Sequence, residues 1–268
     1  MLSLLPASRH ANLARRAGVA LGTVVVTLYF CLLVMGRAVL GRLRREHVDR
    51  YTRVWSAALL RLVGLRLTVQ GDCPDFSDGR RYLILCTHSS HYDIPVSFVA
   101  LPGSIRMLAK SELFRIPFLG RAMRMAEFPF VARHNPQQAR RDLELARQMM
   151  ESGIVLWAAP EGTRSPDGRL QPFKKGCFHL AFDTDAVIVP VAIRGIHQVL
   201  PARTWRLNLN QSVQLAIGAP IDTCRYSRDD MAALMDDTRQ TMQQLLSEGE
   251  TRVETQPFEV EMIENRAK

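Results

Sequence analysis

Two histidines and an aspartate lie within six positions of one another, directly after a short apolar run. The stretch reads CTHSSHYDIP over residues 86–95 and follows the run RYLIL. Histidine titrates near neutral pH and can act as a general base, and a carboxylate beside it fixes its tautomer and stabilises its charged form. The simplest alternative is a polar loop after a strand.

The spacing decides which histidine can work with Asp93. His91 is two residues from Asp93, and side chains two residues apart rarely face each other in a helix. His88 is five residues away. If a strand ends near Cys86 and a helix begins near Ser90, the chain folds back and the carboxylate reaches the His88 ring, at the strand end where α/β active sites lie. We therefore predict a His88–Asp93 pair, with hydroxyls satisfying the helix N–H groups: Thr87, Ser89 and Ser90.

A second polar segment follows another apolar run. Residues 160–165 read PEGTRS, a turn that offers backbone N–H groups, hydroxyls and the guanidinium of Arg164. Such a turn can hold a phosphate or an oxyanion. The alternative is a solvated loop in which Glu161 and Arg164 form a surface ion pair.

Short apolar runs alternate with helical patterns over residues 65–250, which predicts an α/β domain with a mixed, mostly parallel sheet covered by helices. A helix is expected at 136–151, capped by Asn135, and another at 229–248; residues 251–268 are a tail. The expected strands are short and apolar, and several are β-branched: 65–70, 82–86, 105–109, 128–132, 154–158, 186–193 and 212–218.

Residues 1–64 form a separate section with a membrane segment. Residues 17–36 read AGVALGTVVVTLYFCLLVMG without a charge, and a helix of that length spans about 30 Å, the thickness of a bilayer's hydrocarbon core. A signal peptide would have a shorter apolar region and a cleavage site, and a buried soluble helix is a further alternative. Arginines are denser after this segment than before it, which places the following domain in the cytosol.

Residues 46–63 form a basic amphipathic helix, with Tyr51 and Trp55 on its apolar face. After a membrane segment, such a helix is typical of one that lies in the membrane interface, and the alternative is a helix packed on the domain's own core. The whole chain has a net charge of +9, and ten arginines but only two acidic residues fall in residues 1–64. Nucleic-acid binding is not expected, because this basic section flanks a membrane segment and lacks interleaved aromatic residues.

Cysteine usage and ligand spacing argue against a disulfide framework and a metal site. The cysteines are odd in number and widely spaced, no C-x-x-C occurs, and the pattern H-x-x-H-x-D offers too few ligands. They are Cys31, Cys73, Cys86, Cys177 and Cys224.

Four blocks over roughly residues 45–220 resemble the glycerolipid acyltransferases, and most closely the 1-acylglycerol-3-phosphate acyltransferases. The blocks are His88 to Asp93, AKSELFRIPFLG with EFPFVAR, PEGTRS, and IVPVAIRG. The resemblance implies that His88 and Asp93 are catalytic and that six further residues bind substrate: Lys110, Arg133, Glu161, Gly162, Thr163 and Arg164. The chain departs from the family pattern in four places: Thr87 for a usual Asn, Glu127 for Gly, Ala132 for an acidic residue and Ala159 for Phe.

The resemblance further implies an O-acyltransferase without a metal or cofactor. His88 would take a proton from the free hydroxyl of 1-acylglycerol-3-phosphate (lysophosphatidate), whose oxygen attacks an acyl thioester directly and makes phosphatidic acid. The donor would be acyl-CoA or acyl carrier protein, and the place a bacterial inner membrane with the domain on the cytoplasmic side. Two alternatives stay open: another lysolipid acceptor, such as a lysophospholipid or lyso-ornithine lipid, and a non-enzymatic membrane protein that binds anionic lipid.

Overall fold

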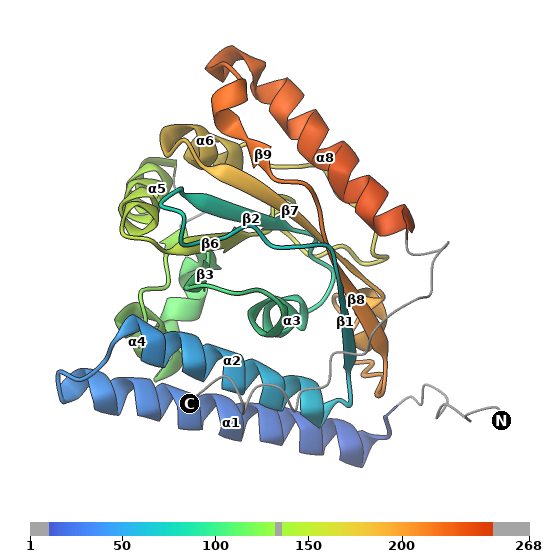
Figure 1. Cartoon of the computed structure of the whole chain (residues 1–268). Coiled ribbons are helices and arrows are strands. Elements are labelled where there is room, and N and C mark those ends of the chain that lie inside the picture. The colour runs from blue at the N-terminus through green and yellow to red at the C-terminus, as the bar shows by residue number, and fades with distance from the viewer. Residues whose placement is uncertain (1–10, 132–135, 249–268) are drawn as a thin grey trace.

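A seven-stranded sheet lies between two layers of helices in a computed structural model of the chain, which describes residues 11–131 and 136–248 (Figure 1). The strand order is β1-β8-β7-β2-β6-β3, and β9 pairs with β7. The strands are β1 (Arg66–Gln70), β2 (Tyr82–Cys86), β3 (Ile105–Met107), β6 (Val155–Ala158), β7 (Val187–Arg194), β8 (Ser212–Ile217) and β9 (Ile221–Asp222).

The sheet is mixed and mostly parallel, as predicted. β2 pairs in parallel with both β6 and β7, while β7 runs antiparallel to β8 and β9. All five residues of β2 are buried, because helices cover both faces of this central strand. Side chains on β2 alternate between two cores, with Ile84 in one and Leu83 in the other. The strand predicted at 128–132 is reduced to β5 (Phe130–Val131), which pairs only with β4 (Ala109–Lys110), outside the main sheet.

The two helix layers differ in position along the chain (Figure 1). One layer holds α2 (Arg45–Leu62), α3 (Asp93–Ala100) and α4 (Leu119–Met125), with α1 (Leu13–Val39) outside them; the other holds α5 (Pro136–Glu151), α6 (Gly176–Asp183) and α8 (Met231–Ser247). The short helices are η1 (Ser111–Arg115), α7 (Ile196–Val199), η2 (Thr223–Arg225) and η3 (Arg228–Asp230). The helices predicted at 136–151 and 229–248 are therefore confirmed, the latter with a 3-10 turn at its start.

Helix α1 has two apolar faces. Phe30, Cys31 and Val34 face α2 and α4 and line a small cavity between the three helices. The opposite face is exposed in the middle of the helix, where apolar residues recur at three- and four-residue steps: Leu21, Val24, Val25, Leu28, Tyr29 and Leu32. By length and composition α1 could cross a membrane, but its inner face is already covered by the domain.

Helix α2 packs between α1 and the domain core, so the core-packed alternative is the one observed. Val48 and Leu60 are buried in the core. The aromatic residues that suggested a membrane interface instead contact α1: Trp55 donates a hydrogen bond to the Thr27 hydroxyl at 3.0 Å, and the rings of Tyr51 and Phe30 lie 6.0 Å apart. Whether α2 also touches a membrane stays a prediction.

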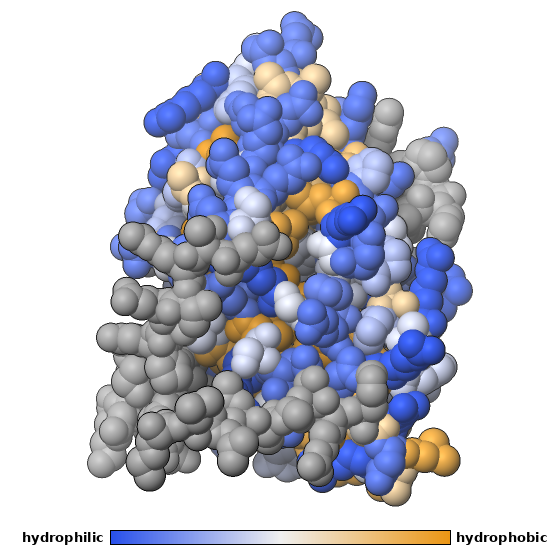
Figure 2. Space-filling view, turned by 90° about the vertical axis from the view of Figure 1, so that its right-hand side faces the viewer, coloured by the Kyte–Doolittle hydropathy of each residue, from blue (hydrophilic) through white to orange (hydrophobic). Residues whose placement is uncertain are grey.

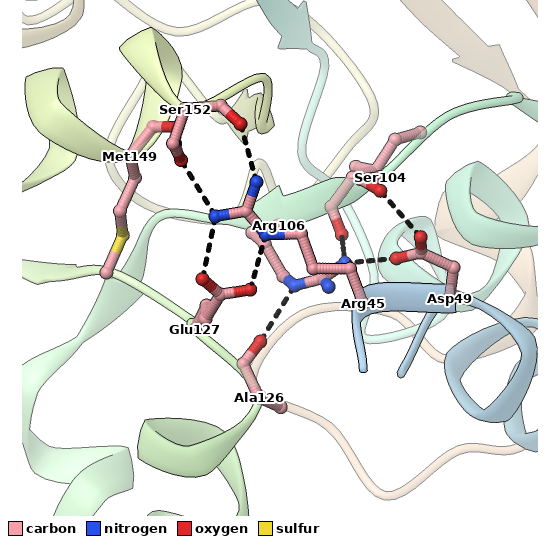
Figure 3. A network of polar contacts seen from close by, with 9 residues as sticks. Arg45, Asp49, Ser104, Arg106, Ala126, Glu127, Met149 and Ser152 are labelled. Carbon is pink, nitrogen blue, oxygen red and sulfur yellow. Dashed lines mark hydrogen bonds and ion pairs between the residues drawn. The ribbon is translucent and has the colours of Figure 1, made fainter. Parts of the chain in front are cut away.

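Two arginine–carboxylate pairs tie the start of α2 to edge strand β3 and to the turn after α4 (Figure 3). Arg106 on edge strand β3 is fully buried, and it bonds to the Asp49 carboxylate at 2.6 Å and to the Ala126 carbonyl at 2.8 Å. One turn earlier on α2, Arg45 forms a two-bond pair with Glu127 at 2.7 and 2.8 Å. Because Arg45 and Asp49 share one face of α2, the helix is fixed at two adjacent points.

Glu127 adopts a backbone conformation that explains why the family usually has glycine there. Its φ is +58°, in the left-handed region that glycine enters without strain. The Glu127 N–H bonds to the Arg124 carbonyl, and the Phe128 N–H to the Met123 carbonyl, which is the Schellman arrangement that ends a helix with glycine. In this chain the ion pair with Arg45 offsets part of the strain.

We expect Glu127→Gly and Glu127→Ala to change stability in opposite directions. Both remove the pair with Arg45, which at this exposure is worth about 0.2–1 kcal/mol. Only glycine relieves the left-handed strain, roughly 1–2 kcal/mol for other residues. Thermal unfolding in detergent should show the glycine variant at least as stable as the native chain and the alanine variant less stable. An alanine variant as stable as the glycine variant would contradict the strain.

Candidate active site

The His88 ring and the Asp93 carboxylate meet where β2 ends and α3 begins. Nδ1 of His88 lies 2.7 Å from Oδ2 of Asp93, which confirms the predicted pairing. A carboxylate only accepts hydrogen bonds, so Nδ1 carries the proton and donates, and Nε2 of the neutral ring is the nitrogen that can accept a proton. The His88 side chain is 19% exposed and that of Asp93 is fully buried, so the imidazole reaches the surface and the carboxylate does not.

Asp93 organises the turn that carries His88. Its Oδ2 also accepts the backbone N–H groups of Ser89 at 2.8 Å and Ser90 at 2.9 Å. The prediction that serine and threonine hydroxyls satisfy the helix N–H groups was wrong, because the helix starts at Asp93 rather than near Ser90 and the aspartate itself accepts from the turn. The Ser90 hydroxyl donates to the Leu200 carbonyl, and the Thr87 hydroxyl accepts from the Ile193 N–H.

Trp157 on β6 packs edge-on against the His88 ring, with centroids 6.2 Å apart and planes at 85°. Its indole N–H donates to the Ser97 hydroxyl, which in turn donates to the backbone carbonyl of Asp93. The indole is thus held in place from α3, and it limits rotation of the imidazole on its inner side. Nothing in the spacing of the sequence pointed to Trp157, which comes from the neighbouring strand.

Glu161 links the two polar segments. One of its oxygens accepts the His88 N–H at 3.0 Å and the other accepts the Gln171 N–H at 2.8 Å. The side chain is buried, and burial raises the pKa of its carboxyl above the ordinary value. Because both oxygens hold backbone amides, this arrangement favours a positioning role for Glu161 over direct contact with substrate.

Arg164 lies on the loop that contacts His88. The next residue, Ser165, donates its N–H to the His88 carbonyl at 2.7 Å. Partial burial, together with the charges of Arg164 and His88, lowers the pKa of His91, so this ring is neutral near neutral pH. Within the described part of the chain, no ion pair joins Arg164 to Glu161, and the surface-pair alternative for this loop is not observed.

The remaining predicted residues are spread around this centre. Gly162 has a φ of +70°, which its lack of a side chain permits. Thr163 and Lys110 are exposed, and no contact among described residues joins Lys110 to His88. Arg133 lies outside the described residues, as do Ala132 and the predicted cap Asn135. No group of three or more histidine, cysteine or acidic side chains suited to a metal occurs in the described ranges.

Arg239 on α8 supports the same loop from the other helix layer. Its guanidinium donates to the Gln171 carbonyl at 2.8 Å and to the Leu170 carbonyl at 3.2 Å, and it lies 5.3 Å from the centre of the Phe173 ring. Gln171 is the residue whose N–H holds Glu161. No motif pointed to Arg239, because it lies outside the four blocks.

Comparison with known proteins shows the family to which the chain belongs. A family model described as Acyltransferase matches residues 66–194. The chain is similar to the 1-acyl-sn-glycerol-3-phosphate acyltransferase of Haemophilus influenzae, with 31% identity over 67% of this chain and 74% of the relative. The chain belongs to the 1-acylglycerol-3-phosphate acyltransferase family. The departures from the family pattern at Thr87 and Glu127 are accommodated by the contacts described above, so they leave the His88 turn intact.

Two further relatives extend the likeness. The 1-acyl-sn-glycerol-3-phosphate acyltransferase of Cocos nucifera is 30% identical over 74% of this chain, and the chain spans only 62% of that relative's length. The crystal structure of the 1-acyl-sn-glycerophosphate (LPA) acyltransferase of Thermotoga maritima superposes with a TM-score of 0.76 at 25% identity, over 91% of this chain and 98% of that one. The similarity in fold therefore extends over α1 and α2 as well as the sheet.

We expect Arg239→Ala to lower kcat for acyl transfer by up to about 10²-fold, because small displacements of positioned groups have effects of that size. KM and the unfolding temperature should change little. Arg239→Lys should recover only part of the rate, since a single ammonium cannot reproduce the planar donor pair. Gln240→Ala, exposed on the same helix, is the matched control. Equal kcat values for the Arg239→Ala and Gln240→Ala variants would exclude the positioning role.

Proposed function

We propose that the chain transfers an acyl group from an acyl thioester to the free glycerol hydroxyl of 1-acylglycerol-3-phosphate, making phosphatidic acid. The observation that carries this proposal is the buried Asp93 carboxylate on Nδ1 of His88, which leaves Nε2 as a proton acceptor at the surface. Membership of the acyltransferase family supports the reaction class. The donor is acyl-CoA or acyl carrier protein, and no metal or cofactor takes part.

In the proposed mechanism Nε2 of His88 removes the hydroxyl proton as the oxygen attacks the thioester carbonyl. The imidazolium that forms is stabilised by Asp93, whose orientation is fixed by the two N–H groups of Ser89 and Ser90. The tetrahedral intermediate collapses with cleavage of the carbon–sulfur bond, and the His88 proton passes to the leaving thiolate. The oxygen–acyl bond forms, the thiol leaves, and His88 returns to its neutral state.

Direct attack is supported by the state of the cysteine closest to His88 in sequence. Cys86 at the end of β2 is fully buried, and burial raises the pKa of its thiol well above the ordinary value. A buried thiol of raised pKa is a poor nucleophile. An acyl-enzyme on this cysteine is therefore not part of the proposal.

A place at a membrane is supported by the exposed face of α1. The inner face of α1 is covered by α2 and α4, so a vertical crossing of the bilayer would take the domain into hydrocarbon. Insertion of the exposed face into one leaflet avoids this. In Figure 2 the lower edge is mostly hydrophilic or grey, with hydrophobic residues mainly at its right-hand corner, at the height of α1 in Figure 1. We place the chain at a bacterial inner membrane with its domain on the cytoplasmic side.

Loss of the base tests the function. His88→Ala and Asp93→Ala should each lower the rate of thiol release from acyl-CoA with lysophosphatidate by about 10²–10⁴-fold. His91→Ala, which removes an exposed ring from the same turn, is the matched control and should cost far less. Circular dichroism and membrane association of all three variants should match the native chain. If the His88→Ala variant retains most activity while the His91→Ala variant is inactive, the assignment of the base is wrong.

Replacement of Arg164 tests the acceptor. A phosphomonoester has close to two negative charges and three terminal oxygens, which a guanidinium meets with paired bonds of about 1.5–3 kcal/mol each. Arg164→Ala should mainly raise KM for lysophosphatidate and narrow its preference over lysophosphatidylcholine and lyso-ornithine lipid. Arg164→Lys should restore only part of this preference.

The acceptor panel also separates the alternatives. A native preference for an acceptor without a phosphomonoester would move the function to another lysolipid. An unchanged acceptor ratio in the Arg164→Ala variant would exclude phosphate recognition by this residue. Absence of thiol release with every acceptor, together with binding to anionic lipid, would favour a non-enzymatic binding protein.

A further inference from the structure

A second basic and apolar surface lies beside the C-terminal end of α1, away from the His88 turn. It surrounds a cavity of about 310 Å³ between α1, η1 and α4. The cavity shares none of its lining with the candidate active site; it is lined by Met35, Phe114, Arg115, Ile116, Pro117, Phe118, Arg121 and Arg124. We call this set the α4 surface.

The three arginines of the α4 surface are available for an anion. Arg115, Arg121 and Arg124 are all exposed, and none of them forms an ion pair with another described residue. Arg124 lies 5.4 Å from the centre of the Phe114 ring, which holds its guanidinium at the cavity. The nearest acidic residue in sequence, Glu112, has an interaction of its own. Three guanidinium groups around one hollow suit a phosphate, which they bind with paired hydrogen bonds.

The same surface exposes two large apolar side chains between the arginines. Ile116 is 45% exposed and Phe118 is 51% exposed. Phe118 has a φ of +61°, an unfavourable conformation for an aromatic residue that persists only where the surrounding structure enforces it. The Ala122 N–H bonds to the Phe118 carbonyl and the Gly120 N–H to the Ile116 carbonyl, so the loop is fixed with both side chains outward.

The α4 surface continues the exposed apolar face of α1. Met35 lines the cavity one turn beyond Leu32, which belongs to that face. A basic surface with exposed apolar residues, next to a helix that enters a leaflet, is the composition of a membrane-interface contact. Phosphate groups of the lipids lie at the depth at which these arginines would sit when Ile116 and Phe118 reach the acyl boundary.

We propose that the α4 surface binds the phosphate of an anionic phospholipid in the leaflet that α1 enters, with Ile116 and Phe118 inserted beside its acyl chains. A zwitterionic head has an ammonium that three arginines repel, whereas an anionic head does not. The site is separate from acceptor binding at the His88 turn, and it sets which membranes the enzyme occupies.

Vesicle partition of the full chain tests the proposal, with phosphatidylcholine vesicles that do or do not contain phosphatidylglycerol. Arg115→Gln/Arg121→Gln should weaken binding to the anionic vesicles by about tenfold or more, because each basic residue near an anionic surface contributes about a factor of five. Binding to pure phosphatidylcholine should change little. The matched control is Arg225→Gln/Arg228→Gln, which removes the same charge between β9 and α8 at the end of the molecule opposite α1 (Figure 1).

Phe118→Gly tests the apolar part without strain, since glycine takes the positive φ of this position freely. This variant should bind both kinds of vesicle more weakly while unfolding at the native temperature or above. Equal weakening of the two arginine double variants would overturn the proposal in favour of a general charge effect. The proposal would also be overturned if inorganic phosphate, but not sodium chloride of equal ionic strength, displaced the protein from anionic vesicles. The α4 surface would then bind free phosphate rather than a lipid.

These measurements require no acyl donor and no turnover. A chain that binds as expected but transfers no acyl group would therefore leave the α4 surface supported and the proposed reaction rejected. A chain that transfers acyl groups but binds both vesicle types equally would support the proposed reaction and reject the role of the α4 surface.

Discussion

One carboxylate oxygen holds the turn between β2 and α3 together. Oδ2 of Asp93 accepts from the His88 ring and from the N–H groups of Ser89 and Ser90. Burial of a carboxylate is unfavourable unless its charge is hydrogen-bonded. The three donors on Oδ2 compensate part of the burial and fix the backbone that carries the histidine, while the buried Oδ1 has no hydrogen-bond partner among the described residues. The same bonds hold the ring with Nδ1 inward. The orientation of the His88 ring thus follows from the hydrogen bonds that the buried Asp93 oxygen accepts.

A second buried carboxylate, that of Glu161, holds two loops together by accepting hydrogen bonds from their backbone N–H groups. Glu161 holds amides of two segments that lie far apart in sequence, at His88 and at Gln171. Arg239 then fixes the Gln171 segment to α8. The two acidic side chains near the histidine therefore have different roles, since Asp93 bonds to the imidazole ring and Glu161 bonds to backbone N–H groups. A motif pattern cannot distinguish these two roles, which depend on where each oxygen finds a donor.

The sequence predicted the parts of this structure that depend on local pattern. The apolar runs at β2 and β7 and the periodic helix α5 required only neighbouring residues, and the five-residue spacing of His88 and Asp93 required a single turn. One local prediction failed, because the Asp93 carboxylate and not the serine hydroxyls accepts from the turn. The contacts that were missed all join distant segments. Arg106 pairs with Asp49 across 57 positions and Trp157 reaches His88 from the next strand; neither relation leaves a trace in spacing. Tyr51 and Trp55 suggested a helix at the membrane interface. In the structure both side chains pack against the apolar inner face of α1 instead.

The arrangement of helices links the exposed face of α1 to the turn that carries His88. The exposed face of α1 would set the depth in the leaflet, α1 packs on α2, and α2 packs on α3, whose first residue is Asp93. The Arg45 and Asp49 pairs hold the start of α2 to the turn after α4 and to edge strand β3. On the proposed function the acceptor's hydroxyl is also fixed in depth, because its acyl chain stays in the leaflet. On that proposal, the packing of α1, α2 and α3 would place His88 at the same depth in the leaflet as the acceptor hydroxyl. Residues far from His88 in the sequence would then contribute to catalysis because they determine this depth.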